Sequence, residues 1–214
     1  MNIYNLIILD ESGSMSSIQQ QAISSMNETI QTVKAAQKKH PELKQFISLI
    51  SFSGSGMEGV KVIRDRVSAD SVAEIREEEY VPDSCTPLYD AMGFGITSLD
   101  KAISKEDTVL VTIITDGMEN SSEVYSSSAV SELVESQRKK GWTFAYIGAN
   151  QDSVEVAREM NISNALNFRA NGHGVKKMTR TLNELRTTFY DMACEAPDSL
   201  RDRKDLFIDA ESDC

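Results

Sequence analysis

The 214-residue sequence predicts an α/β fold: a six-stranded, mostly parallel sheet with one antiparallel edge strand and helices on both faces. Short runs of branched apolar residues alternate with longer segments whose apolar residues recur at helical spacing, which is the pattern of parallel strands joined by helical crossovers. Two of the runs lie close together with a glycine-rich connection, which is typical of a hairpin. The hydrophobic content of 40% is enough for one substantial core.

The first predicted unit is a strand, a loop and a helix. Residues 3–9 are a short, branched apolar run, which suits a strand buried on both faces of a parallel sheet. The run stops at Asp10, and a polar loop occupies residues 10–15. Helical spacing then predicts an amphipathic helix that ends near residues 38–41 and presents the apolar residues Ile18, Ala22, Met26, Ile30 and Val33.

The next segments predict a hairpin and two helices. Residues 46–52 and 60–63 have the composition of strands, and the connection between them predicts an antiparallel pair with one strand at an edge of the sheet. Residues 71–79 predict a short acidic helix. A longer helix is expected over residues 88–103, so Thr86 lies at a helix entrance.

The second half of the chain continues the alternation. Residues 109–114 are the most strand-like segment, and they run into a polar loop at residues 115–122, as the first strand runs into Asp10. The remaining predicted elements are a helix over 127–140 that stops at Gly141, a strand over 143–147, a short helix over 154–160, a weak strand over 165–168 and a long helix with apolar residues from Val175 to Met192.

One domain is expected, over residues 1–194. Residues 195–214 form an acidic tail with few apolar groups, which we expect to be flexible or loosely docked. The chain has 22 Lys and Arg against 33 Asp and Glu, a formal net charge of −11. This balance argues against nucleic acid as a partner, because such binding depends on basic groups that neutralise phosphates.

Cysteine usage and hydropathy predict a cytoplasmic protein. Cys85, Cys194 and Cys214 lack the spacing of a zinc or redox pair, so we expect free thiols in a reducing compartment. The apolar run near the start is too short for a signal peptide and lacks a basic leader. No stretch approaches the roughly 20 apolar residues of a membrane span, so a membrane is not an expected partner either.

Polar residues with oxygen side chains collect at the predicted carboxyl edge of the sheet, where ligands bind in open α/β folds. Three loops supply two carboxylates and three hydroxyls, namely Asp10, Ser12, Ser14, Thr86 and Asp116. The alternating spacing of the first three lets them face one ion. A hard-oxygen set without histidine or thiolate suits Mg²⁺ or Mn²⁺, and two carboxylates are too few to remove all the water from Mg²⁺.

Each loop alone has an ordinary structural explanation. The serines that follow Asp10 are candidate helix caps, Asp116 with Gly117 is a common turn, and Thr86 with Pro87 is a common helix start. Because all three loops carry oxygen ligands at once, we favour the metal site.

These motifs resemble a known family. Asp10-x-Ser12-x-Ser14, the segment that begins with Thr86, and Thr115-Asp116-Gly117 look like the metal-ion-dependent adhesion site of von Willebrand factor type A domains. The order and approximate separations match over residues 1–194, and the resemblance is to the small, stand-alone bacterial or phage type.

The resemblance implies a Rossmann-like fold with strand order 3-2-1-4-5-6, which puts the strands before Asp10 and Asp116 side by side. It also implies that hydroxyls such as those of Ser12, Ser14 and Thr86 contact Mg²⁺ directly or through water, while the two aspartates often act through water. The implied function is metal-dependent protein binding, in which a partner's Asp or Glu carboxylate fills a vacant coordination position.

Residues next to the motif are expected to form a partner-binding rim, although ordinary loop solvation is an equal alternative. They are Glu11, Met15, Tyr89, Glu119 and Asn120. Cys85, which directly precedes Thr86, is interpreted as a packing residue, because a soft thiol is a poor ligand for Mg²⁺.

The competing prediction is an enzyme, a Mg²⁺-dependent phosphohydrolase with Asp10 as nucleophile. Such enzymes typically have a second acid two residues later, where this chain has Ser12, and no nucleotide-binding glycine-rich motif is present. Serine hydrolysis is not supported, because the serines lack a nucleophile elbow and the only histidines, His40 and His173, are interpreted as solvated loop residues.

Overall fold

A computed structural model describes residues 1–149 and 153–195 of the chain. The six strands are β1 (Asn2–Asp10), β2 (Lys44–Phe52), β3 (Val60–Ser68), β4 (Thr108–Thr115), β5 (Thr143–Ala149) and β6 (Asn164–Phe168). The five α-helices of the described part are α1 (Gln19–Lys39), α2 (Leu88–Ala102), α3 (Ser127–Lys139), α4 (Ser153–Glu159) and α5 (Gly172–Glu195). Short 3-10 turns occupy Gly13–Ile18, Gly56–Gly59 and Glu77–Glu79.

The strands form one sheet in the order β3-β2-β1-β4-β5-β6. All neighbouring strands are parallel except β2 and β3, which pair antiparallel at one edge. The expected α/β class, the edge hairpin and the strand order are therefore confirmed. β1 lies between β2 and β4, so its apolar run is buried on both faces, as a central parallel strand requires.

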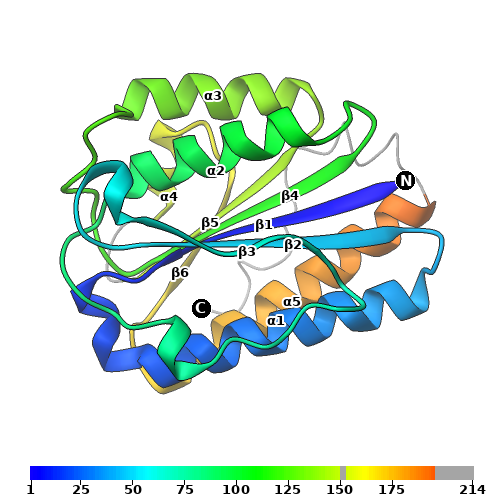
Figure 1. The fold of residues 1–214 in the computed structure, drawn as a ribbon, viewed down its shortest axis with the longest axis horizontal. Helices are drawn as coiled ribbons and strands as arrows, with labels where there is room; N and C mark the ends of the chain where they lie inside the picture. Colours follow the sequence, from blue (N-terminus) through cyan, green and yellow to red (C-terminus); the bar gives the residue numbers. More distant parts are fainter. Residues whose placement is uncertain (150–152, 196–214) are drawn as a thin grey trace.

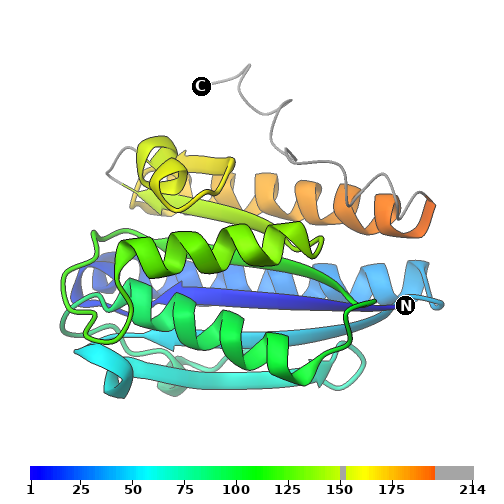
Figure 2. The same ribbon diagram turned by 90° about the horizontal axis from the view of Figure 1, so that it is seen from above.

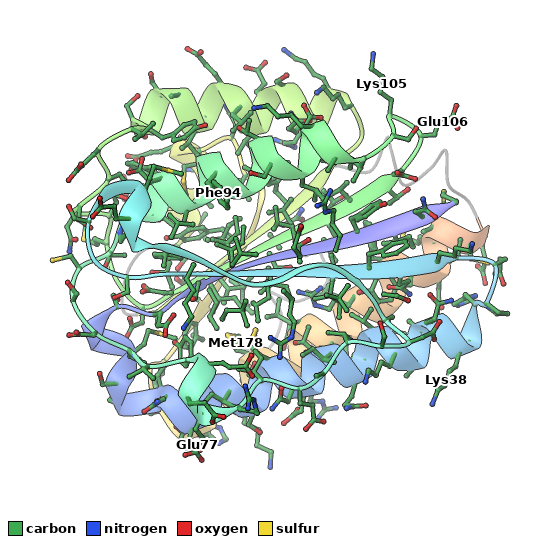
Figure 3. The ribbon with its side chains drawn as sticks, viewed as in Figure 1. Lys38, Glu77, Phe94, Lys105, Glu106 and Met178 are labelled. Atoms are coloured by element: carbon green, nitrogen blue, oxygen red, sulfur yellow. The ribbon has the colours of Figure 1, made fainter. Side chains whose placement is uncertain are left out.

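Helices cover both faces of the sheet (Figures 1 and 2), and each face has its own core. Alternate residues of β1 divide between them: Ile7 packs with α1 and α5, whereas Ile8 packs with α2 and α3. Figure 3 shows these two layers of side chains, with Met178 on the α1 and α5 side and Phe94 on the α2 side. Within the described residues, no helix combines the length and apolar character that a bilayer crossing requires.

The register of β1 and β4 positions the loops that follow them. Leu9 pairs with Ile114, so both strands reach the same edge of the sheet at the same level. Asp10 ends β1 and Thr115 ends β4, and the chain leaves both strands in polar loops. The loops that carry Asp10 and Asp116 therefore start next to each other.

Two expectations about the middle of the chain need correction. The third strand is longer than residues 60–63, because it continues to Ser68. The helix expected over residues 71–79 does not form, and only the 3-10 turn Glu77–Glu79 is helical. The expectation of a flexible tail concerns residues that, from position 196 onward, lie outside the described part of the chain.

Candidate metal centre

The loop after β1 folds back on the carboxylate that ends the strand. The backbone N–H of Ser12 donates to Asp10 Oδ1 at 2.7 Å, which is an Asx-type turn. Ser12 and Asp10 are buried, whereas Ser14 is exposed at the start of the 3-10 turn. The hydroxyl oxygens of Ser12 and Ser14 are 3.1 Å apart. The alternating spacing seen in the sequence thus brings these side chains together.

The loop after β4 is tied to the first loop by two hydroxyl–carboxylate hydrogen bonds. Ser14 Oγ donates to Asp116 Oδ1 at 2.5 Å, and Thr115 Oγ1 donates to Asp10 Oδ2 at 2.5 Å. These short O–H···O⁻ bonds are of the charge-assisted kind. The two aspartates, which are far apart in the sequence, therefore belong to one hydrogen-bonded cluster.

Thr86 reaches the same place from the entrance of α2. Its backbone N–H donates to Asn120 Oδ1 at 2.8 Å, and the Asn120 N–H donates to the Thr86 carbonyl at 3.2 Å. These two bonds attach the loop before α2 to the loop after β4. Thr86 is buried, so its hydroxyl faces the interior of the loop cluster.

Gly117 shows where the oxygens converge. A methyl group placed on this glycine would lie 3.2 Å from Thr86 Oγ1, 3.6 Å from Asp10 Oδ2 and 3.6 Å from Ser14 Oγ. One point beside the Gly117 backbone is thus close to oxygens from two loops, the loop after β1 and the loop before α2, and Gly117 itself lies on the third loop. The space is kept open because residue 117 has no side chain.

This donor set fits a hard divalent cation. All five side chains offer oxygen, two of them are carboxylates, and ligands of this kind suit Mg²⁺ and Mn²⁺. The residues that would hold the ion are Asp10, Ser12, Ser14, Thr86 and Asp116. The structure brings together all five residues that the sequence analysis selected.

The electrostatics of the cluster also favour a cation. Burial raises the pKa of Asp10 above its ordinary value, and the nearby carboxylate of Asp116 adds to this effect, although hydrogen bonds from Ser12 and Thr115 oppose it. Burial likewise raises the pKa of Asp116, against the hydrogen bond from Ser14. Two adjacent carboxylates are costly to ionise without a counter-charge, and a divalent cation would supply one.

The expected rim is only partly at the surface. Met15 is 1% exposed and packs in the core beside α1, so its placement on the rim is wrong. Glu11 is also buried and is bonded to Ser51, Lys61 and the Val81 backbone, so it braces the loops instead of facing a partner.

Two further rim candidates are half-buried, and one is exposed. Glu119 accepts from the backbone N–H groups of Tyr89, Ser121 and Ser122, so this carboxylate shapes the loop. Tyr89 packs partly against the α2 core. Asn120 is exposed and holds Thr86 in place.

Several supporting residues were not identified from the sequence. The buried carboxylate of Asp90 accepts from the backbone N–H groups of Glu123, Val124 and Tyr125, at 2.7 to 3.0 Å, and so fixes the loop that carries Asp116. Tyr80 donates its hydroxyl to the Asp10 carbonyl at 2.5 Å. Asp90 could have been identified from the sequence, because it is a carboxylate on the apolar face of a predicted amphipathic helix.

Two other residues differ from their sequence interpretation. Cys85 is exposed, so it is not a packing residue. His40 is not a freely solvated loop residue, because its side chain is only 12% exposed and its Nε2 lies 2.7 Å from Asp191 Oδ1.

No protein-family model and no curated protein sequence matches this chain, but solved structures share its fold. A von Willebrand factor type A protein from Catenulispora acidiphila superposes with a TM-score of 0.62 at 16% identity, over 86% of this chain and 42% of that one. The pilus adhesin SpaC from Lactobacillus rhamnosus GG, in its open conformation, gives 0.66 at 10% identity, over 88% and 30%.

A third similar structure is the D319A mutant of the PilB minor pilin from Streptococcus sanguinis, with a TM-score of 0.63 at 15% identity over 92% of this chain. This chain spans 63%, 30% and 42% of the lengths of the pilin, the adhesin and the Catenulispora protein. At such identities the similarity establishes the fold alone: the chain has the fold of a von Willebrand factor type A domain.

Proposed function

We propose that this chain is a metal-dependent protein-binding module, with Mg²⁺ or Mn²⁺ held by Asp10, Ser12, Ser14, Thr86 and Asp116 as in a metal-ion-dependent adhesion site. The observation that carries the proposal is the convergence of oxygens from Asp10, Ser14 and Thr86 on the open space beside Gly117, with Asp116 of the third loop hydrogen-bonded to Ser14. The bound ion would supply a positive centre for a partner's Asp or Glu carboxylate.

The surface around the site supports contact with a protein. Loops at this edge expose three large apolar side chains, Val81 at 57%, Met118 at 70% and Val124 at 63%. A carboxylate-binding centre with exposed apolar neighbours has the chemistry of a protein interface, in which a few polar contacts are set among apolar ones.

The hydrolase alternative is weakened by the placement of Asp10. A nucleophilic carboxylate needs one oxygen free to reach the phosphorus atom. Asp10 is 0% exposed, and its two oxygens accept hydrogen bonds from the Ser12 N–H and the Thr115 hydroxyl. This arrangement suits a residue that anchors loops and a cation better than one that attacks a substrate.

A pull-down from the native cytoplasm tests the proposal. Wild-type protein is used as bait with Mg²⁺ and with EDTA, beside the double variant Ser12→Ala/Asp116→Ala. Ser17→Ala is the matched control, because Ser17 is an exposed hydroxyl on the same 3-10 turn. We expect a partner retained by the wild type and by Ser17→Ala in Mg²⁺ only. Equal retention with EDTA or by the double variant would contradict metal-dependent binding.

A further inference from the structure

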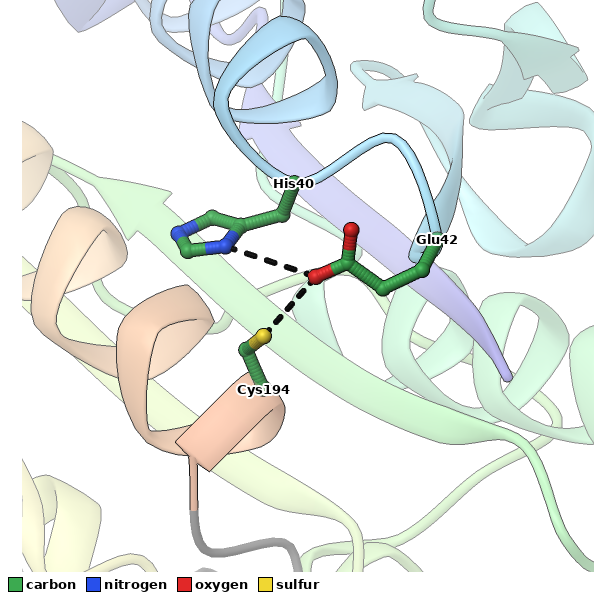
Figure 4. Close-up of side chains that lie close together, drawn as sticks. All are labelled: His40, Glu42 and Cys194. Atoms are coloured by element: carbon green, nitrogen blue, oxygen red, sulfur yellow. Dashed lines mark hydrogen bonds and ion pairs between the residues drawn. The ribbon is translucent and has the colours of Figure 1, made fainter.

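A second cluster of side chains that could hold a metal ion lies away from the first. We call the first cluster, Asp10, Ser12, Ser14, Thr86 and Asp116, the oxygen site. His40 follows the last residue of α1, Glu42 lies on the loop to β2, and Cys194 is in the last turn of α5. Their ligand atoms all lie within 4.8 Å of one another. Figure 4 shows the three side chains pointing toward one another, with the Glu42 carboxylate between the imidazole and the thiol.

The two helix ends reach this point because α1 and α5 run side by side along one face of the sheet (Figures 1 and 2). Both helices start at the edge that carries the oxygen site and end at the opposite edge. α1 has 21 residues, so at about 1.5 Å per residue the two sites are about 30 Å apart. The cluster is therefore independent of the proposed function.

The histidine is already oriented for coordination. His40 Nε2 lies 2.7 Å from Asp191 Oδ1, and Lys39 Nζ holds the same carboxylate at 2.7 Å. With its Nε2–H donated to Asp191, the ring has its Nδ1 lone pair directed toward Glu42, where the Nδ1–Oε1 distance is 3.6 Å. A carboxylate behind the histidine is the usual arrangement at metal ligands, because it fixes the tautomer and the ring orientation.

The spacing of the donors is close to that of a tetrahedral ion. With Zn–N and Zn–O near 2.0–2.1 Å and Zn–S near 2.3 Å, ligand atoms should be about 3.3–3.6 Å apart. The His40 Nδ1 to Glu42 Oε1 separation of 3.6 Å meets this value. The Cys194 Sγ to Glu42 Oε1 hydrogen bond is 2.8 Å and has to open slightly. Glu42 is 56% exposed on a loop, so a side-chain rotation achieves this.

We propose that His40, Glu42 and Cys194 form a zinc site that joins the end of α1 to the end of α5. Imidazole and thiolate are ligands that zinc favours and Mg²⁺ does not, so the site and the oxygen cluster select different metals. On binding, the thiol proton of Cys194 leaves to solvent and a Zn–S bond forms. Neutral imidazole, one thiolate and one carboxylate balance the charge of Zn²⁺, and the fourth position is open to water.

Cobalt substitution tests the site, because Co²⁺ bound to a thiolate gives a charge-transfer band that oxygen ligands do not give. The reduced protein is titrated with Co²⁺ in the presence of excess Mg²⁺, which would occupy the oxygen site. We expect a thiolate band that saturates at one equivalent and disappears when Zn²⁺ is added. The band should be absent in Cys194→Ser and in His40→Ala.

Matched controls separate this cluster from the other thiols. Cys85→Ser removes an exposed thiol next to the oxygen site, and Cys214→Ser removes the thiol at position 214. Both should keep the band, with native circular dichroism confirming that every variant folds. A wild type without a band, or a band that persists in Cys194→Ser, would overturn the proposal.

A conservative variant tests the role of the carboxylate behind the histidine. Asp191→Asn retains all three proposed ligands but weakens the hold on the His40 ring, so we expect Zn²⁺ affinity to fall about 10- to 100-fold. Lys39→Met is its control, since it removes a second described partner of Asp191 and leaves His40 in place. Unchanged zinc affinity in Asp191→Asn would contradict the proposed arrangement.

Discussion

At the scale of single residues, Asp10 and Asp116 share two features. Each carboxylate holds a loop through hydrogen bonds, and each belongs to a cluster in which negative charge is unfavourable without a cation. The neighbouring hydroxyls of Ser14 and Thr115 donate to these carboxylates and offset part of that cost. These hydrogen bonds therefore hold the oxygen side chains together, as the proposed metal site requires.

The raised pKa of Asp116 has a consequence for stability. A carboxyl group whose folded-state pKa is raised lowers the stability of the fold while it is ionised, and this cost disappears as the pH falls through that pKa. Asp116→Asn removes the charge and keeps an acceptor for Ser14. At pH 7 in EDTA we expect the variant to unfold at a higher temperature than the wild type, and to gain nothing from Mg²⁺.

Asp100→Asn is the control for this thermal measurement. Asp100 is on the surface of α2 and pairs with Lys140 at 2.9 Å. Neutralising it should change stability little, because surface ion pairs contribute about 0–1 kcal/mol. If Asp116→Asn lowered the unfolding temperature in EDTA, the carboxylate would be a stabilising group and our account of the site's electrostatics would be wrong.

The rim residues show what the sequence could not decide. Glu11 and Met15 are adjacent to the motif, and adjacency suggested exposure. The structure instead turns Met15 into the core beside α1 and surrounds Glu11 with Ser51 and Lys61. Which side of a loop faces the protein depends on contacts with distant elements, and no local pattern encodes those contacts.

At the scale of elements, the sequence predicted every strand and α-helix of the described part, but it also predicted a helix over residues 71–79 that does not form. There the backbone groups are bound by side chains from other elements. Asn27 of α1 contacts both the N–H and the carbonyl of Ile75, and Arg64 of β3 donates to the carbonyls of Ala73 and Glu74. These tertiary bonds hold residues 73–75 in a non-helical conformation and override the helical propensity of the segment.

Glu79 should be the main contributor to the stability of this segment. Hydrogen bonds from Arg64, and then from Arg76, lower its pKa from 4.5 to about 2. A lowered carboxyl pKa gives stability that is complete above the unfolded-state value and is lost as the pH falls toward the folded-state value. Glu79→Gln should therefore cost about 1.5–3 kcal/mol at pH 7.

Urea unfolding measures this cost. The difference between wild type and Glu79→Gln should shrink between pH 4.5 and about 2, where Glu79 takes up its proton. Glu78→Gln is the matched control, because Glu78 pairs only with the exposed Arg76 in the part of the chain that the structure describes. An equal effect of the two variants at pH 7, or a difference that does not depend on pH, would contradict the assignment.

At the scale of the whole molecule, the strand order creates the oxygen site. β1 and β4 are neighbours although the β2–β3 hairpin and α2 lie between them in sequence, so the two aspartates meet at one edge. This cluster of oxygens could be predicted from the alternating spacing of Asp10, Ser12 and Ser14 and from the polar loop that follows β4. The His40, Glu42 and Cys194 cluster was not predictable, because it depends on where two long helices end relative to each other.

Calorimetric titration with MgCl₂, repeated with MnCl₂, tests the central claim most directly. The account predicts that the wild type and Ser17→Ala bind one ion at the oxygen site, and that Ser14→Ala and Asp116→Ala do not. Ser17 is an exposed hydroxyl near the site but outside the cluster. Absence of divalent binding by the wild type at millimolar metal, or equal binding by Asp116→Ala, would contradict the claim that these loops form a metal centre.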